Sequence, residues 1–496
     1  MNYPDAPAPT GWRVAPEVAA APPSVSADGR TYSFRIRKGF RFSPPSNEPV
    51  TAETFRYTIE RALSPRFGPQ AVAAAFVSDI VGVDAYRAGR ARHVAGISAR
   101  GNTLTIRLER PAGDLSARMA LPYFCAVPLP TPIVPNGLEE PIHSAGPYYL
   151  AEHLEEVVAV VKRNPNYPGP RPQRLDAIVF RRPNVPKADA VSLIESGEAD
   201  HLGEYDALES DVSLVANGSV ADRYGPPHRA GSPRFLVSPL LAIDYLAFNA
   251  QRPLFSDARL RRAVNFALDR RAISDTYGWP PADHYLPPGM PGYRNAHLYP
   301  TGRPDLARAR ALARGRGGRA VLHVCGDAPY CTQWARIIRS SLAAIGIEVV
   351  VRVSSDPLAR AAAQGADMLL TRTSASFNRS YYQDPVTFLE NALAVPRSRT
   401  RLRREVTADC PFCGVPPGWF RTKRFERELE RIRRLGGRER EDAAGSLDFE
   451  IARAAPGAVL VSETFSQFFS ARMGCQTFQP LYFGVDLAAL CMREGD

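Results

Sequence analysis

Hydrophobic and polar residues alternate in several short stretches of the chain, as they do in β-strands with one buried face. In residues 31–37, aromatic and aliphatic side chains occupy every second position. Residues 96–111 predict two strands joined by the turn Gly101-Asn102, because glycine and asparagine readily adopt the backbone angles of a tight hairpin. Further strands are predicted at residues 145–153, 155–164, 175–182, 244–249, 319–325 and 348–353.

Apolar residues three or four positions apart predict amphipathic helices elsewhere. Residues 50–63 have this spacing, with Thr51 as the N-cap and Thr54 in the place of a capping-box glutamate. Further helices, each ended by a glycine, are predicted at residues 187–200 and 330–347. The last helix lies between the last two predicted strands, and such a β-α-β unit implies parallel strands. The pattern therefore predicts α/β lobes.

The most basic helix is predicted after a strand that ends at Phe248-Asn249 and a turn at residues 253–255. Asp257 is a suitable N-cap for it. One face is an apolar stripe, and we expect the arginines to lie largely on the other faces, where they are solvated or cover apolar surface with their stems. The stripe consists of Leu260, Ala263, Val264, Ala267 and Leu268, and the arginines are Arg259, Arg261, Arg262, Arg270 and Arg271.

The net charge of +11 invites a role in binding nucleic acid or anionic membranes. The composition disfavours that role. Lysine occurs at four positions only, and the abundance of arginine, alanine, proline and glycine is typical of GC-rich coding. A chain of 496 residues is long enough for two or three packed units. No run of about 18 apolar residues predicts a transmembrane helix.

Seven cysteines suggest local pairs. Six of them are candidates for structural disulfides, which would place the protein in an oxidising compartment. Cys125 is left over, and we expect it to be a small buried hydrophobic residue. Zinc is the rival interpretation, but no second CxxC or histidine pair follows at the required spacing, so no metal site is predicted. The candidate pairs are Cys325 with Cys331, Cys410 with Cys413, and Cys475 with Cys491.

The sequence contains no phosphate-binding loop, no dinucleotide-binding glycine motif, no HExxH and no GxSxG. Acid pairs such as Glu426 and Glu430 lie in a charged helix, where salt pairs on a solvated face explain them. No catalytic residue or cofactor site is predicted, although the two acids of a glycosidase can come from distant loops.

Several segments together resemble the family 5 extracytoplasmic solute-binding proteins, the peptide- and nickel-type binding subunits of ABC importers. The FN…PLF.D.RLRRAVNFALDRRAI block at residues 248–273 is the most specific of them. The others, in the order in which the family has them, are DGRTYSFRIRKGFRFS with EPVTAETFRYTIERAL, SAGPYYL, VKRNPNYPGPRPQRLDAIVF, ESGEAD, PPGMPGY and QDPVTFL.

The resemblance implies an α/β, two-lobed periplasmic-binding-protein fold of type II with an additional inserted domain. A hinge would join the lobes, which close on a ligand between them. The inserted domain would be residues 12–143. Lobe I would be 144–245 and 461–496, and lobe II 246–460. Proteins of this family carry out no chemistry; they deliver a small solute or peptide to an ABC permease in the membrane. We expect a monomer that binds no nucleic acid.

The family begins with a signal peptide, whereas the first twenty residues here have no basic start and no apolar core. We therefore expect an extracytoplasmic location, in the periplasm or at the cell surface, for a full-length protein with roughly 50–80 further residues upstream, including the first strand of lobe I. An in-frame stop directly upstream of Met1 in the genomic DNA would contradict this hypothesis.

The resemblance implies that peptide binders of the family hold the ligand's ammonium group with an aspartate in a loop of the form W..DY.DP. In SASFNRSYYQDPVTFL that aspartate falls at Tyr381 and the family's tryptophan at Asn378. Either Asp384 takes over the role, or the ligand is a capped peptide, a sugar or another solute without a free amino terminus. Asp384 could also be a simple turn residue. The predicted ligand-binding residues are Phe377, Asn378, Tyr381, Tyr382 and Asp384.

Two other classes of function stay open. An α/β hydrolase lacks any motif in its favour. A ligand-sensing module of a transcription regulator is an alternative, because some regulators carry the same module behind a helix-turn-helix; nothing of that kind precedes Asp28. Thiol titration of the unfolded, unreduced protein separates the alternatives, since an exported protein should have about one free thiol and a cytosolic one six or seven.

Overall fold

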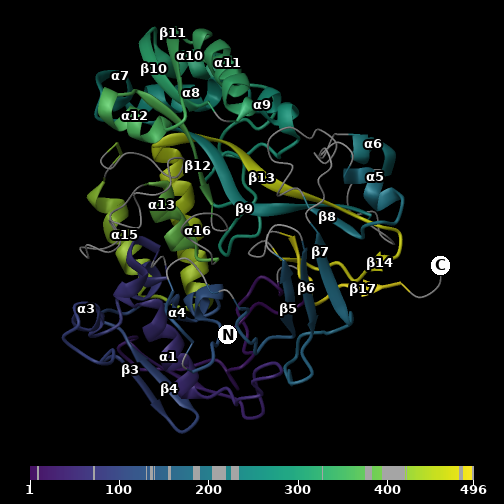
Figure 1. Cartoon of the computed structure of the whole chain (residues 1–496). Coiled ribbons are helices and arrows are strands. Elements are labelled where there is room, and N and C mark those ends of the chain that lie inside the picture. Colours follow the sequence, from purple (N-terminus) through teal and green to yellow (C-terminus); the bar gives the residue numbers. More distant parts are fainter. Residues whose placement is uncertain are drawn as a thin grey trace.

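Two long antiparallel strands, β9 (Phe235–Phe248) and β13 (Gly457–Phe469), run through the middle of the computed structural model (Figure 1). They belong to a six-stranded sheet with β8 (His201–Gly203), β10 (Gly318–Cys325), β11 (Ile347–Ser354) and β12 (Met368–Ser374). The strand order is β11-β10-β12-β9-β13-β8. β10 pairs in parallel with β11 and β12, which confirms the predicted β-α-β unit, and the other neighbours are antiparallel.

The structure describes the chain except for residues 8–9, 71–72, 130, 135–137, 139, 155–157, 182–189, 204–218, 225–233, 327, 375–382, 394–418, 421, 480–483 and 494–496.

Strand β9 is longer than the sequence predicted. It covers 14 residues, and the predicted strand at 244–249 corresponds to its last part. Almost every residue of β9 is buried, because helices or loops cover both faces of the sheet along most of its length. A strand that is buried on both faces shows no alternation of polar and apolar residues, so the alternation did not predict the first part of β9.

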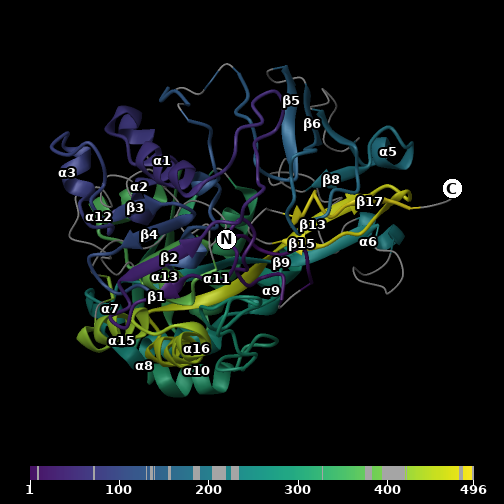
Figure 2. The ribbon, with the colours of Figure 1, turned by 90° about the horizontal axis from the view of Figure 1, so that it is seen from below.

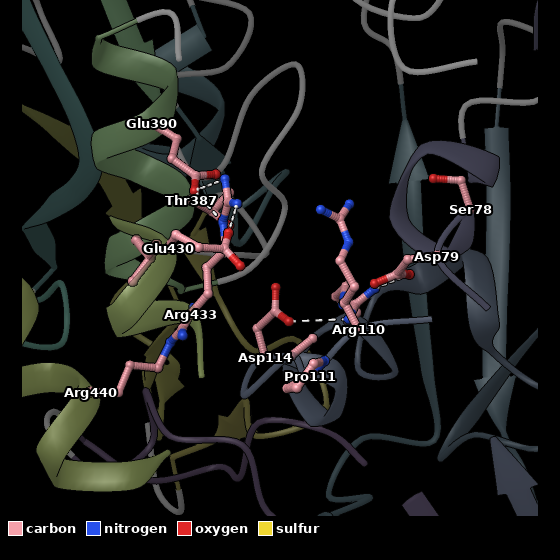
Figure 3. A pocket seen from close by; sticks show the side chains of 13 residues that line it. Ser78, Asp79, Arg110, Pro111, Asp114, Thr387, Glu390, Glu430, Arg433 and Arg440 are labelled. Atoms are coloured by element: carbon pink, nitrogen blue, oxygen red, sulfur yellow. Dashed lines mark hydrogen bonds and ion pairs between the residues drawn. The ribbon is translucent and has the colours of Figure 1, made fainter. Parts of the chain in front are cut away.

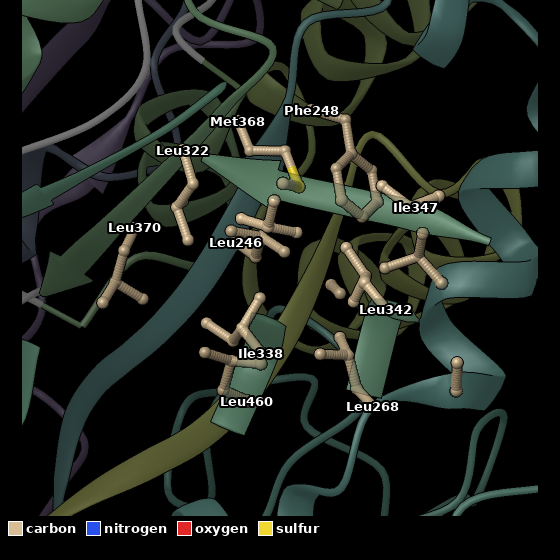
Figure 4. Close-up of a cluster of buried hydrophobic side chains, with 14 of the residues drawn as sticks. Leu246, Phe248, Leu268, Leu322, Ile338, Leu342, Ile347, Met368, Leu370 and Leu460 are labelled. Atoms are coloured by element: carbon tan, nitrogen blue, oxygen red, sulfur yellow. The ribbon is translucent and has the colours of Figure 1, made fainter. Parts of the chain in front are cut away.

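Alternate residues of β9 enter two cores on opposite faces of the sheet, which together form the large lobe. Leu246 and Phe248 pack against the first group of helices (Figure 4), and Tyr245 and Ala247 pack against the second. The first group is α8 (Ala258–Ala267), α9 (Arg270–Tyr277), α10 (Leu306–Ala313) and α11 (Pro329–Ala343). The second is α12 (Pro357–Gln364), α13 (Pro385–Ala392), α15 (Lys423–Arg433) and α16 (Gly437–Ala454).

The basic stretch after β9 differs from the prediction in two ways. The turn is a one-turn helix, α7 (Pro253–Ser256), and the helix is broken into α8 and α9. Asp257 caps α8 as predicted. The expectation that the arginines are solvated is wrong for Arg261 and Arg270, which are 5% and 0% exposed. Their guanidinium groups donate hydrogen bonds to backbone carbonyls, those of Ala454, Ala455 and Phe255 for Arg261 and those of Val459, Asn265 and Pro300 for Arg270.

An N-terminal region forms a second sheet and its own core. The sheet contains β1 (Ser24–Val25), β2 (Thr31–Arg35), β4 (Thr103–Arg107) and β3 (Ile97–Arg100), in that order. The helices are α1 (Ala52–Ala62), η1 (Pro65–Gln70), α2 (Ala74–Val77), α3 (Val83–Arg87), α4 (Leu115–Arg118) and η2 (Pro122–Phe124). The predicted hairpin is confirmed, and so is the capping box, in which the hydroxyls of Thr51 and Thr54 each accept a hydrogen bond from the other residue's backbone amide.

The small lobe surrounds the other ends of β9 and β13. Phe235 and Leu236 of β9 and Phe468 and Phe469 of β13 lie in its cores. Figure 2 shows it at the opposite end of these strands from α8 and α10. Its elements are β5 (Tyr148–Leu154), β6 (Val158–Arg163), β7 (Ala177–Arg181), α5 (Ala190–Glu195), α6 (Ser219–Tyr224), β14 (Met473–Gly474), β15 (Phe478–Gln479), β16 (Gly484–Val485) and β17 (Cys491–Met492). The domain boundaries given above stay a prediction.

Two of the three predicted disulfides are present. Cys325 is bonded to Cys331, and Cys475 to Cys491. The third predicted pair, Cys410 and Cys413, lies outside the described residues. Cys125 is a free cysteine, as expected, but it is exposed and not buried. The loop after η2 leaves the core of the N-terminal region at Phe124, so the next residue faces outward.

Candidate ligand-binding site

Four of the five predicted ligand-binding residues, Phe377, Asn378, Tyr381 and Tyr382, lie outside the described residues. Their segment follows β12 directly in the chain, so it starts at the carboxyl end of a strand of the central sheet. Ligands of open α/β sheets bind at the carboxyl ends of the strands. The assignment of these four residues stays a prediction.

Asp384, the fifth, has a structural role. It is 4% exposed and caps α13, where its Oδ2 accepts a hydrogen bond from the backbone amide of Thr387 at 2.8 Å. Its Oδ1 accepts one from Nε of Arg440 on α16, also at 2.8 Å. Both oxygens are therefore engaged within the large lobe. The structure supports the interpretation of Asp384 as a turn and cap residue, and ligand contact by Asp384 stays a prediction.

Three other charged residues meet at the centre of the sheet. Asp244, Arg372 and Glu463 come from the neighbouring strands β9, β12 and β13, and we call them the hinge ion cluster. Asp244 is opposite Arg372 in the register, and Nη2 of Arg372 lies 2.6 Å from Oε2 of Glu463. Each is the single charged residue of its strand. The two carboxylates are almost fully buried, at 3% and 2% exposure.

A change of register brings Glu463 into this cluster. The pairing of β13 with β9 shifts between Ser462 and Thr464, so Glu463 has no partner in the ladder. β-Bulges of this kind turn a side chain toward a site and are common beside active and binding sites. Here the irregularity lies where β13 passes from the core of the large lobe to that of the small lobe.

The hinge ion cluster contains two acids and one arginine. Burial, and then the negative charge of Glu463, raise the pKa of the Asp244 carboxyl well above its ordinary value, against the opposing effect of Arg372. Burial alone would lower the pKa of Arg372, but the two carboxylates reverse this and raise it. Oδ2 of Asp244 and Oε1 of Glu463 are both buried, and a hydrogen bond between the two carboxyl groups also raises the pKa of Asp244. A hydrogen bond of this kind favours the protonated form of one of the two acids.

An aromatic group lies next to the hinge ion cluster. Tyr277 ends α9 and Trp279 follows it, while Tyr330 and Trp334 belong to the first turns of α11. Neighbouring ring centroids of the four residues are 4.8–6.0 Å apart. Burial, followed by the negative charge of Asp244, raises the pKa of Tyr330, so its hydroxyl lies within electrostatic range of that carboxylate. The disulfide between Cys325 and Cys331 joins the end of β10 to the first turn of α11, which contains Tyr330.

A hollow of about 80 Å³ lies elsewhere, between the N-terminal region and the large lobe (Figure 3). Its walls carry ion pairs, including Arg118 with Asp79 at 2.7 Å and Arg433 with Glu430 at 2.6 Å. The backbone amide of Gly113 donates to the carbonyl of Arg433 across it, at 3.1 Å. Each of these ion pairs lies within one wall, and the backbone hydrogen bond joins the two walls, so we interpret the hollow as part of the contact between the two regions.

The hinge ion cluster was missed in the sequence, although a signal for it was present. In LLAIDYLAF, MLLTRTS and VLVSETF, one charged residue interrupts an otherwise uncharged strand. A buried charge is expensive and needs a partner, so an isolated charge in each of three such strands indicates that the three meet. No helix among the described residues is both long and apolar enough to cross a membrane.

Comparison with known proteins finds relatives among bacterial binding proteins. The sequence is 25% identical over 301 residues to the probable deoxycholate-binding periplasmic protein YgiS of Escherichia coli, and 24% over 289 residues to the oligopeptide-binding protein OppA of Bacillus subtilis. These matches cover 58% and 55% of this chain and 52% and 48% of the two relatives. The chain thus spans about half the length of these curated relatives.

Two solved structures show the same fold over nearly the whole chain. The clavulanic acid biosynthesis oligopeptide binding protein 2 superimposes with a TM-score of 0.80 at 21% identity, over 100% of this chain and 89% of that protein. NikA from Brucella suis, in complex with Fe(III)-EDTA, gives 0.71 at 20% identity, over 99% and 93%. The predicted two-lobed fold of type II is confirmed. The pattern described as bacterial extracellular solute-binding proteins, family 5, matches residues 13–393, and the chain belongs to this family.

Proposed function

We propose that the protein is the substrate-binding component of an ABC import system. It captures a peptide-like or other small solute between its lobes and delivers it to a membrane permease. Membership of the family supports this role, and so does the hinge ion cluster, which is the observation that carries it: three buried charged groups meet where the strands pass from one lobe to the other.

The two long strands support a hinge. In each of them, one end lies in the cores of the large lobe and the other end in those of the small lobe. Pro239 in β9 and the register shifts of β13 lie between the two ends. Proline and bulges weaken a ladder of hydrogen bonds, so the strands can bend there more easily than elsewhere. Hinge closure around a ligand uses a few residues of this kind.

The two disulfides support an extracytoplasmic location, because disulfides persist in oxidising compartments. This argues against the cytosolic regulator. We propose a monomer that acts without a catalytic residue or cofactor. The relatives' names mention oligopeptides and deoxycholate, and one structurally similar protein was solved with a metal chelate. Membership of the family therefore does not determine the class of ligand.

The test is to combine thermal unfolding with small-angle X-ray scattering. The probes are a tryptic digest of casein, deoxycholate, nickel with histidine, and maltotriose. A true ligand at about 100 times its Kd stabilises the protein by roughly 2.7 kcal/mol and should also reduce the radius of gyration as the lobes close. The surface variant Arg271→Met should respond as the wild type does. If no probe changes either quantity, the proposed function is contradicted for these classes of solute.

A further inference from the structure

We propose that residues 2–7 and 10–17 act as a strap that holds the two lobes in one relative orientation, and that this strap leaves the small lobe when the lobes move. The inference rests on the proposed function, because it assumes a binding protein whose lobes change orientation at the hinge. The strap adds a connection between the lobes to those made by β9 and β13. In both ribbon views the start of the chain lies at the middle of the molecule (Figure 1, Figure 2).

Hydrogen bonds attach the strap to the small lobe. Nε2 of Gln479 in β15 donates to the carbonyl oxygens of Pro4 and Gly11, at 2.9 and 3.0 Å. The indole nitrogen of Trp12 donates to the carbonyl oxygen of Phe478, which also lies in β15, at 3.3 Å. A Cβ at Gly11 would lie only 3.0 Å from Nε2 of Gln479, so the strap runs close against this side chain. These three hydrogen bonds join the strap to one strand of the small lobe.

Apolar contacts attach the same strap to the large lobe. Tyr3 is 2% exposed and packs in the core of the second group of helices, together with Tyr285 and Met290. The ring of Trp12 lies against Gly289, where a Cβ would come within 1.8 Å of Cζ3 of the indole. Gly289 has a φ of +91°, so the backbone conformation and the close approach both favour glycine. Trp12 therefore contacts both lobes at once.

The attachment to the small lobe is the weaker one. A hydrogen bond within the protein exchanges for one with water at a small net cost, whereas exposing an aromatic side chain loses the free energy of its burial. Oε1 of Gln479 is buried without a hydrogen-bond partner within the described part of the chain. Release of the strap would let water bind this oxygen. A change of lobe orientation should therefore break the bonds to β15 and leave Tyr3 in the large lobe.

A segment that packs on one lobe only is the alternative. Its hydrogen bonds and its apolar contacts would then go to the same core. Here Phe478 packs against the core of the small lobe, whereas Tyr3 lies in a core of the large lobe. The side chain of Trp12 joins the two, since its N–H group and its ring have partners in different lobes. The contacts therefore favour a strap across the hinge.

Pulsed electron paramagnetic resonance on the whole chain tests the inference without any ligand. Nitroxide labels are attached through a ketone-bearing amino acid, which leaves the cysteines unmodified, at the exposed positions Ser340 on α11 and Glu198 after α5. The wild type should give one narrow distribution of distances between the labels. Gln479→Leu removes two of the three hydrogen bonds to β15, so a second distance should rise in population by roughly fivefold or more. Adding Trp12→Phe removes the third bond but keeps a ring against Gly289, and it should increase this population further.

Gln476→Leu is the matched control, because Nε2 of Gln476 donates to the carbonyl oxygen of Met473 within the small lobe, at 3.3 Å. Its distances should equal those of the wild type. Thermal unfolding is measured for every variant, since a merely structural role would lower the stability and leave the distances unchanged. That result for Gln479→Leu overturns the inference. If Gln479→Leu does not fold, Trp12→Phe alone decides, and an unchanged distribution in it overturns the inference equally.

Failure of the inference and failure of the proposed function are distinguishable. Unchanged distances in the variants, with solute probes that still bind, overturn the strap and leave the proposed function standing. Distances that respond to Gln479→Leu and not to Gln476→Leu support the strap. If they respond in this way but no solute probe binds, the strap stands as a joint between the lobes and the proposed function fails.

Discussion

Substituting Arg270 by methionine tests how much one buried arginine stabilises the large lobe. Its guanidinium donates to the carbonyls of Val459, Asn265 and Pro300, and at 2.8 Å to the side-chain oxygen of Asn265. The substitution leaves four acceptors without a donor. At about 2 kcal/mol for each acceptor, the loss of stability is roughly 8 kcal/mol. Burial lowers the pKa of Arg270 to about 10, so removal of the charge recovers roughly 3 kcal/mol. We expect a net loss of about 5 kcal/mol.

The assay is urea unfolding followed by tryptophan fluorescence, since Trp279 and Trp334 lie in the same core as α9. Arg271→Met is the control, because Arg271 is exposed and, within the described part of the chain, forms its ion pair with Asp275 one turn away. Its loss should change the free energy of unfolding by less than about 0.5 kcal/mol. If Arg270→Met lies within about 1 kcal/mol of this control, the reasoning about buried carbonyl acceptors is refuted.

Three further predictions concern other parts of the molecule. Burial lowers the pKa of His201 to about 4, so on acidification the unfolded chain binds a proton at this residue before the folded protein does. The free energy of unfolding should therefore fall as the pH drops from about 6.5 to 4. The fall is at most roughly 3 kcal/mol and should be absent in His201→Gln. Replacing Cys475 and Cys491 by alanine opens a loop of 16 residues and should lower the free energy of unfolding by about 3 kcal/mol, while the exposed Cys125→Ala leaves it unchanged. Gly113→Val would bring a Cβ within 2.2 Å of the carbonyl of Leu435, so calorimetry should show the N-terminal region unfolding separately; an unchanged single transition would argue that this contact does not join the two regions.

The local elements were predictable where a single face is buried. The hairpin around Gly101 and the capping box at Thr51 depend on neighbours in the sequence, and both are present in the structure. Strand β9 was predicted too short, because burial on both faces removes the alternation on which the prediction rested. The arginines of α8 and α9 were assigned to solvent for a related reason: helical spacing says which residues share a face, but not what covers that face.

The residues of the candidate site were likewise predictable only where a local motif identifies them. Asp384 was identified as a ligand or turn residue from its motif, and its engagement with Arg440 became evident only once α13 and α16 were packed together. Asp244, Arg372 and Glu463 are more than 90 residues apart along the chain at the closest, so no local motif connects them.

The sequence by itself determined the family, most of the local elements and two of the disulfide pairs, because these depend on short-range spacing and on motifs that survive in order. Only the tertiary structure decided which charges are buried and which are solvated. Burial depends on the elements that pack around a residue, and a charge in a low-dielectric interior is tolerated only when opposite charges or carbonyls converge on it. In this protein the pairing of β12, β9 and β13 brings the three charges together at the centre of the sheet.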